Sequence, residues 1–225
     1  QGACSGLFTA NTMACLTEVI GLALPFSAGA PAPFEERDEY AVASGKAVVE
    51  LIRRNLRPRD IVTLDALHNA AAIVGATGGS TNAALHLPAM AHEAGIRFTL
   101  QDVAEIMRRT PHIADLKPGG KYVAADVHRI GGVPVIIKAL LDGGYLKGDC
   151  ITVTGKTLAE NHRDVIVPKD QDVVYPTTNP ISPIGGVVAL LAGLIAAYFY
   201  TQMARERRKP RFEKIKDALR GGISR

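Results

Sequence analysis

Residues 64–92 read LDALHNAAAIVGATGGSTNAALHLPAMAH, and this stretch sets the fold class of the chain. Apolar and small residues recur at helical spacing on both sides of Gly78 and Gly79, which predicts helices over 63–75 and 81–93 joined by a tight turn. Gly95 follows the second helix and ends it, as a glycine just past a helix commonly does. The core of this chain is therefore expected to be rich in helices.

The same alternation of helices and glycine or proline turns continues along the rest of the chain. Apolar periodicity predicts further helices over 9–22, 37–56, 99–109 and 134–142. Thr99 followed by Asp102 has the spacing of a capping box, and Pro134 suits the first position of a helix. On the helix over 37–56 one face is expected to be apolar, formed by Tyr40, Ala47, Val48, Leu51 and Ile52.

Short strands complete the predicted fold. Residues 150–154 (CITVT) are the clearest strand, and 165–167 and 173–175 are weaker ones, because β-branched residues are enriched in each. The expected fold class is therefore α/β, with many helices and few short strands.

Composition excludes several classes of protein. Apolar residues make up 47% of the 225 residues and charged residues 21%, which argues against disordered and collagen-like chains. Three cysteines without CxxC spacing disfavour a disulfide framework and favour a reducing, cytoplasmic compartment. With no Trp and 5% aromatic residues, the chain also lacks the stacking side chains typical of nucleic-acid binders.

The C-terminal part differs from the rest in charge and hydropathy. Nine lysines and arginines against three acidic residues give residues 201–225 a formal charge of +6, which leaves −2 for the remainder. Before them, residues 184–200 are almost wholly apolar, and a helix of that length would rise about 25 Å, marginal for a bilayer core of about 30 Å. A non-catalytic, membrane-tethered α/β module is therefore an alternative interpretation, although it would place a body with reduced cysteines outside the cell.

One cysteine lies in a chemically distinctive setting. Residues 2–13 read GACSGLFTANTM, so Cys4 occupies a loop of small residues directly before a helix. Small neighbours admit a bulky group, and the positive end of a helix favours the thiolate that binds metals or acts as a nucleophile. A buried structural thiol is the alternative for Cys4, and it is the expected role of Cys15 and Cys150.

The turn between the first two predicted helices has the composition of an anion site. Gly78, Gly79, Ser80, Thr81 and Asn82 offer backbone N–H groups, hydroxyls and a helix N-terminus to a carboxylate or phosphate. The alternative is an ordinary helix start capped by Ser80 or Thr81. The six histidines show no tight zinc-site spacing and are expected in structural or surface roles.

Several motifs together resemble one family. The sequence is similar to the dihydroxy-acid dehydratase and sugar-acid dehydratase family in the order and spacing of its motifs over residues 1–186. The matching segments are GACSGLFTANTM (2–13), LDALHNAAAIVGATGGSTNAALHLPAMAH (64–92), ADLKPGGKY (114–122), GGVP (131–134) and GDCITVTGKTLAEN (148–161).

The resemblance implies a function. Family members remove water from a 2,3-dihydroxy acid to give a 2-keto acid, using an iron–sulfur cluster and Mg²⁺. It implies that Cys4 is a ligand of that cluster, of either the 2Fe–2S or the 4Fe–4S type, and that Gly79, Ser80, Thr81 and Asn82 bind substrate. The expected substrate belongs to valine and isoleucine biosynthesis, with a sugar acid or phosphogluconate as the alternative. The resemblance also implies a cytoplasmic homodimer.

It further implies a domain organisation. Residues 1–172 are expected to be the C-terminal part of the family's N-terminal α/β domain, and 173–190 a linker into a β-rich C-terminal domain. Residues 191–225 diverge from the family, as a shifted reading frame or a gene fusion would produce. The chain is thus expected to be an internal piece without catalytic residues of its own, and inactive alone. A poorly folded remnant is the remaining alternative.

Overall fold

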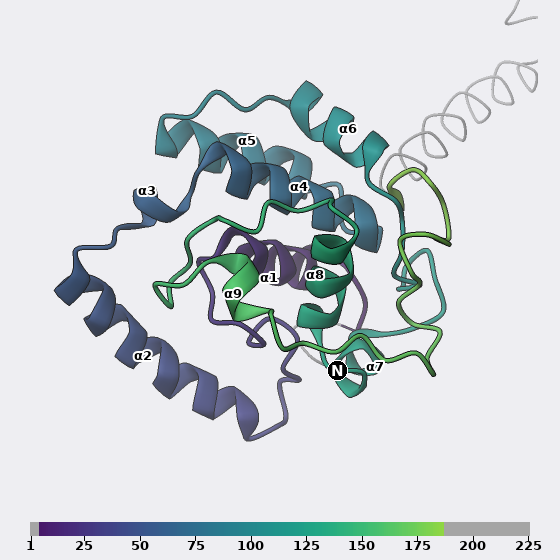
Figure 1. The fold of residues 1–225 in the computed structure, drawn as a ribbon, viewed down its shortest axis with the longest axis horizontal. Coiled ribbons are helices and arrows are strands. Elements are labelled where there is room, and N and C mark those ends of the chain that lie inside the picture. Colours follow the sequence, from purple (N-terminus) through teal and green to yellow (C-terminus); the bar gives the residue numbers. More distant parts are fainter. Residues whose placement is uncertain (1–4, 187–225) are drawn as a thin grey trace, which may run out of the picture. The chain divides into compact units, whose positions relative to one another are not determined.

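A computed structural model of the chain describes residues 5–186, all within one compact unit, Gln1–Val188 (Figure 1). Cys4 and the divergent segment 191–225 lie outside the described residues, as does most of the apolar run 184–200. No helix in the described part is long and apolar enough to span a membrane. The helices of this part are α1 (Thr9–Ile20), α2 (Glu36–Arg54), α3 (Pro58–Ile61), α4 (Leu64–Thr77), α5 (Ala83–Ala94), α6 (Leu100–Arg109), α7 (Ala124–Arg129), α8 (Val133–Asp142) and α9 (Leu158–Asn161).

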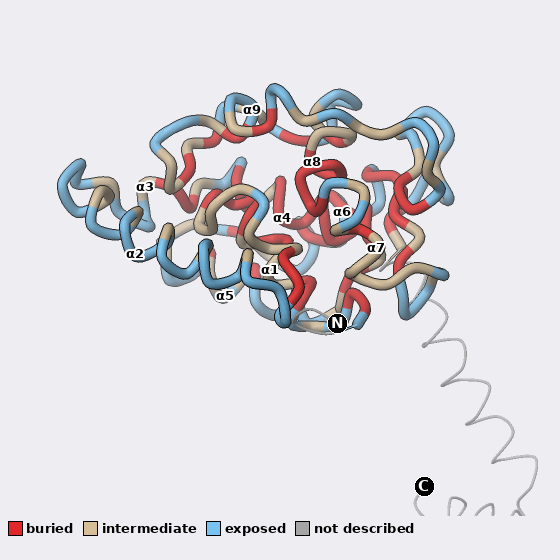
Figure 2. Tube along the Cα trace, turned by 90° about the horizontal axis from the view of Figure 1, so that it is seen from below, coloured by how far each residue is buried: buried red, intermediate tan, exposed pale blue. Residues whose placement is uncertain are grey.

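Helix α4 forms the centre of the core. It packs against α1, α5, α6 and α8, and its residues are buried on every face (Figure 2). A helix that is apolar all round is stable only when other elements surround it. Its small residues permit close packing, since a Cβ added at Gly75 would lie 3.3 Å from the Cα of Met107 on α6.

Most predicted helix ends are confirmed. Thr99 and Asp102 form the expected capping box at the start of α6, and Pro134 lies in the first turn of α8. Gly78 and Gly95 adopt left-handed conformations, with φ of 61° and 75°, directly after α4 and α5. Glycine adopts positive φ without the steric cost that other residues meet there, so these ends were visible in the sequence.

The predicted strands are wrong for the described residues, which contain isolated β-bridges but no strand. The segment 150–154 turns back on itself, because Gly155 N donates to Thr152 O and Thr152 N donates to Lys156 O. Val174 of the segment 173–175 makes one bridge, to Ala114, and 165–167 makes none. β-Branched composition alone therefore did not make strands here. Only 173–175 pairs with a distant segment, 113–115, and that pairing is a single bridge with two backbone hydrogen bonds. The described part is helix-rich, and a β-rich domain beginning at 173–190 stays a prediction.

The prediction of which residues form the apolar face of α2 is also partly wrong. Tyr40, Ala47 and Leu51 are half-buried against the body, but Val48 and Ile52 are exposed. Each residue advances about 100° around a helix, so 48 and 52 lie well round from the face that 47 and 51 present. The predicted face was too wide, and α2 carries apolar residues on its outer side.

Candidate functional site

The structure brings together two motifs that are far apart in the sequence. Thr9 and Thr12 in the first turn of α1 meet Ser80 and Asn82 of the glycine turn. Thr12 Oγ1 accepts from Ser80 N at 2.9 Å, Asn82 Nδ2 donates to Thr9 Oγ1 at 2.7 Å, and the Thr9 and Ser80 hydroxyls lie 3.2 Å apart. The start of α1 and the turn before α5 therefore form one polar joint.

Glycine is required on the turn side of this joint. A Cβ added at Gly79 would lie 2.9 Å from Cγ2 of Thr12, closer than real Cβ contacts come. The helix after the turn does not use the expected cap, because its N-cap residue is Asn82 and no side chain makes the capping hydrogen bond. Ser80 and Thr81 are therefore not the N-cap, and Ser80 uses its hydroxyl within the joint.

The segment that directly follows Cys4 is held at both edges by backbone hydrogen bonds. Leu7 N donates to Lys117 O at 2.7 Å, and Ala124 N donates to Ser5 O at 3.0 Å. Between them Gly6 approaches closely, since a Cβ there would lie 2.7 Å from Lys117 O. The ADLKPGGKY motif (114–122) thus lies beside the chain that leads into α1. Cys4 itself lies outside the described residues.

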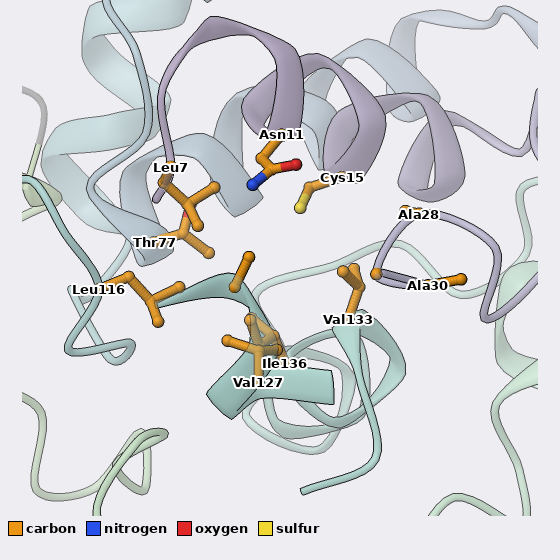
Figure 3. Close-up of a pocket in the computed structure, with 12 residues that line it drawn as sticks. Leu7, Asn11, Cys15, Ala28, Ala30, Thr77, Leu116, Val127, Val133 and Ile136 are labelled. Atoms are coloured by element: carbon orange, nitrogen blue, oxygen red, sulfur yellow. The ribbon is translucent and has the colours of Figure 1, made fainter. Parts of the chain in front are cut away.

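A small, mainly apolar pocket of about 20 Å³ lies under this segment (Figure 3). Asn11 and Cys15 of α1 line one wall, opposite Val127 of α7 and Ile136 of α8. Asn11 is buried, and its Nδ2 donates to Gly6 O at 2.8 Å. The pocket therefore lies against the same helix turn that carries the polar joint.

The two described cysteines are buried, which confirms their expected role. Cys15 lines the apolar pocket, and Cys150 lies 3.5 Å from Asn69 Nδ2. Burial raises the pKa of the Cys150 thiol, which disfavours the thiolate that a metal would need. Among residues 5–186, no three His, Cys, Asp or Glu side chains gather to hold a metal ion.

His112 stands beside the glycine turn. A Cβ added at Gly78 would lie 3.0 Å from His112 Nε2, and that nitrogen is buried without a hydrogen-bond partner among the described residues. Desolvation lowers the pKa of this imidazole, so the neutral form is favoured. No sequence pattern predicted this position of His112, because the spacing of histidines does not indicate which distant turn each one contacts.

A buried carboxyl on the other side of α1 organises the loop that closes the pocket. Glu18 accepts from Phe26 N and from Ala28 N, each at 2.9 Å, and its Oε1 lies 4.0 Å from Nε2 of His162. Burial raises the pKa of Glu18 to about 7. His162 Nδ1 is 2.8 Å from Leu158 O, so that nitrogen carries the proton, and desolvation lowers the pKa of the ring. Sequence reasoning did not find this pair.

Comparison with known proteins identifies the class. Residues 1–161 match the family model described as dihydroxy-acid/6-phosphogluconate dehydratase, N-terminal. The chain therefore belongs to this dehydratase family, as its motifs predicted.

Individual relatives agree with that assignment. The chain is 67% identical over 193 residues to the dihydroxy-acid dehydratase of Parvibaculum lavamentivorans and 62% identical over 193 residues to that of Pelagibacter ubique, covering 86% of this chain and 34% of each relative. The Mycobacterium leprae dihydroxy-acid dehydratase is 52% identical over 195 residues, 86% of this chain and 35% of the relative. The chain thus spans about a third of the length of the curated relatives it matches.

Proposed function

We propose that this chain is part of a hydro-lyase that removes water from a 2,3-dihydroxy carboxylic acid to give a 2-keto acid in branched-chain amino-acid biosynthesis. The observation that carries the proposal is the hydrogen-bonded joint between Thr9, Thr12, Ser80 and Asn82. It unites two motifs that each resemble this family, and relatives 67% and 62% identical to this chain are named dihydroxy-acid dehydratases. A sugar acid or phosphogluconate is the less favoured substrate.

Within that reaction the turn would bind the substrate carboxylate or a hydroxyl group. One of the Thr9 and Ser80 hydroxyls donates to the other, so the accepting hydroxyl keeps its own O–H to donate to a ligand. Gly79, Ser80, Thr81 and Asn82 would form the cradle, with the close packing at Gly79 holding the turn in place. Side-chain groups would make the contacts, because the N–H groups of Gly79 and Ser80 already donate to Val74 O and Thr12 Oγ1. These residues bind and orient the substrate, and no catalytic residue is assigned within this chain.

Cys4 is the proposed ligand of an iron–sulfur cluster of the 2Fe–2S or 4Fe–4S type. Its support is the motif that contains it and the segment directly after it, which backbone hydrogen bonds to Lys117 and Ala124 hold in place. Residues 5–186 by themselves do not provide a ligand set for the cluster or for Mg²⁺, so the remaining ligands would come from elsewhere. When bound, these groups would supply electrophilic activation of the departing hydroxyl.

The remaining assignments follow from the same proposal. Residues 1–172 would form the C-terminal part of the N-terminal dehydratase domain, with 173–190 leading out of it and 191–225 as a divergent segment. A cytoplasmic location suits the thiol content of the chain. The membrane-tethered module through 184–200 stays an alternative, because most of that run lies outside the described residues.

A chimera tests the proposed function. The 193 matched residues of this chain replace the corresponding residues of the Parvibaculum lavamentivorans relative, and the purified protein is assayed with 2,3-dihydroxy-3-methylbutanoate and, in parallel, with 6-phosphogluconate. We expect 2-keto acid from the first substrate only. Ser80→Ala should lower kcat/KM by about tenfold, roughly the effect of one lost hydrogen bond, and Ser44→Ala on the exposed face of α2 serves as its control.

The cluster ligand is tested in the same chimera. Cys4→Ser should abolish both the visible absorption of the iron–sulfur cluster and the activity, whereas Cys150→Ala should retain both. A chimera that converts only sugar acids would overturn the substrate, and a Cys4→Ser chimera that keeps its cluster would overturn the ligand assignment.

A further inference from the structure

The loop of the ADLKPGGKY motif places a lysine beside the segment that leads from Cys4 into α1. Lys117 N donates to Tyr122 O at 2.8 Å within this loop. On the other side, Lys117 O accepts from Leu7 N at 2.7 Å. The backbone of Lys117 is therefore fixed between the rest of its own loop and the segment before α1.

The side chain of Lys117 begins beside Gly6. A Cβ added at Gly6 would lie 3.1 Å from the Cβ of Lys117. In the sequence, Gly6 follows the proposed cluster ligand Cys4 by two residues and precedes Thr9 of the polar joint by three. Because lysine carries its ammonium group on a flexible four-carbon stem, the charge reaches beyond Gly6. Lys117 is therefore placed beside the segment that connects the two parts of the proposed site.

The positive charge of Lys117 is not neutralised within residues 5–186. Lys117 is exposed, and its ammonium group makes no ion pair or hydrogen bond in this part of the chain. Two carboxylates of the region have other partners, since Asp115 Oδ1 accepts from Lys121 N at 3.2 Å and Asp172 accepts from the Tyr122 hydroxyl. An ammonium group without a counter-charge attracts anions.

The polar joint has no such charge. Its side chains offer hydroxyl and amide groups, which suit the hydroxyl groups of a dihydroxy acid; they belong to Thr9, Thr12, Ser80 and Asn82. The carboxylate of that acid is negative, and an ammonium group binds it through a charge-assisted hydrogen bond, which is stronger than a neutral one. We propose that Lys117 binds the substrate carboxylate and that the joint binds the hydroxyl groups. This assignment rests on the proposed function, because it takes the 2,3-dihydroxy acid as the substrate.

Substitutions of Lys117 in the chimera described above test this role. Lys117→Gln should raise KM for 2,3-dihydroxy-3-methylbutanoate about tenfold, the loss expected for one charge-assisted hydrogen bond, and should change kcat by less than about twofold. Lys117→Arg should restore most of the affinity, because a guanidinium group also pairs with a carboxylate. Lys121→Gln is the matched control, since it removes one exposed lysine from the same loop and leaves the residue beside Gly6 in place.

A salt series separates the charge from a packing role. KM of the parent chimera should rise between about 0.05 M and 0.5 M salt, because ions screen the attraction between the ammonium group and the carboxylate. Lys117→Gln should show a much weaker rise, whereas a packing defect would leave the salt dependence of the parent intact. The visible absorption of the cluster should be the same in all four proteins.

Binding of the product gives a readout that does not depend on turnover. Equilibrium dialysis with 3-methyl-2-oxobutanoate, the 2-keto acid formed from the same substrate, should show a dissociation constant about tenfold higher in Lys117→Gln than in the parent chimera. Equal effects of Lys117→Gln and Lys121→Gln, or an unchanged KM and dissociation constant in Lys117→Gln, would overturn the role of Lys117. A chimera that converts no dihydroxy acid would overturn the proposed function instead, and the dialysis would still decide whether Lys117 binds a carboxylate.

Discussion

Glu18 should make the stability of this chain fall as pH rises, and Glu18→Gln should remove that dependence. The carboxyl is 2% exposed, and its folded-state pKa of about 7 lies above the ordinary value of 4.5. Between those two pH values the folded chain holds a proton on Glu18 that the unfolded chain has released. The free energy of unfolding must therefore decrease with pH across this interval.

The size of the effect follows from the pKa difference. Each unit of pKa difference between the folded and unfolded states contributes about 1.4 kcal/mol. The free energy of unfolding therefore falls by about 3 kcal/mol between pH 4.5 and pH 7. The Gln variant has no such loss, but one of the two backbone N–H groups, of Phe26 or Ala28, loses its acceptor at a cost of about 1–3 kcal/mol. The variant should thus be less stable than the parent at pH 5 and approach or exceed it at pH 8.

Urea unfolding of the 225-residue chain, followed by circular dichroism from pH 5 to pH 8, measures this difference. The groups that face Glu18 are His162 and Tyr40. His162 has a lowered pKa and acts in the opposite direction, weakening the fold as pH drops below about 6.5. The His162 contribution is present in both the parent and Glu18→Gln, so the difference between the two isolates the contribution of Glu18. Glu93→Gln, on the exposed side of α5, is the control. A parent-minus-variant difference that stays constant with pH would refute the assignment.

Two further substitutions or probes test the packing around the site. Gly79→Ala should lower the free energy of unfolding by about 1–3 kcal/mol, because its methyl group would collide with Thr12. Gly95→Ala has open space around it and should lower the free energy of unfolding by only about 1 kcal/mol, from backbone strain. Thermal unfolding compares the two, and equal losses would contradict the close contact at Gly79. Cys150 should react slowly with a thiol reagent at pH 8 in the folded chain and at the normal rate in urea, and fast labelling of the native protein would contradict its burial.

The helices could be predicted because their signals are local. Periodicity and the residues at the ends of α4, α5 and α6 act over a few neighbours, so Thr99 with Asp102 or Gly95 is readable without any tertiary contact. The strands failed for the opposite reason. A strand requires a partner strand from elsewhere in the chain, and the segment 150–154 makes a turn of its own and one backbone hydrogen bond to Gly21 after α1. The orientation of α2 likewise depends on what lies beside it.

Long-range pairs could not be predicted from this single sequence. Glu18 and His162 are a helix residue and a late-loop residue, and neither has a local motif that refers to the other. The buried Glu18 carboxyl nevertheless has a defined structural role. It accepts hydrogen bonds from two backbone N–H groups and so holds the loop in place at Phe26 and Ala28. That loop lines the same pocket as Leu7, so a residue outside every recognised motif helps to shape this part of the chain.

The candidate site shows how two weak sequence signals become a stronger structural one. A serine and an asparagine before a helix are compatible with ordinary capping, and so is a threonine in a first helical turn. In the structure these residues do more than cap their own helices. Thr9 and Ser80, 71 residues apart, are hydrogen-bonded to each other, and Thr12 Oγ1 accepts a hydrogen bond from Ser80 N. Capping by itself would not require Gly79 to lie against Thr12, whereas a joint in which Ser80 N donates to the Thr12 hydroxyl does. The contact between the motifs, more than the composition of either, therefore supports a binding role for residues 79–82.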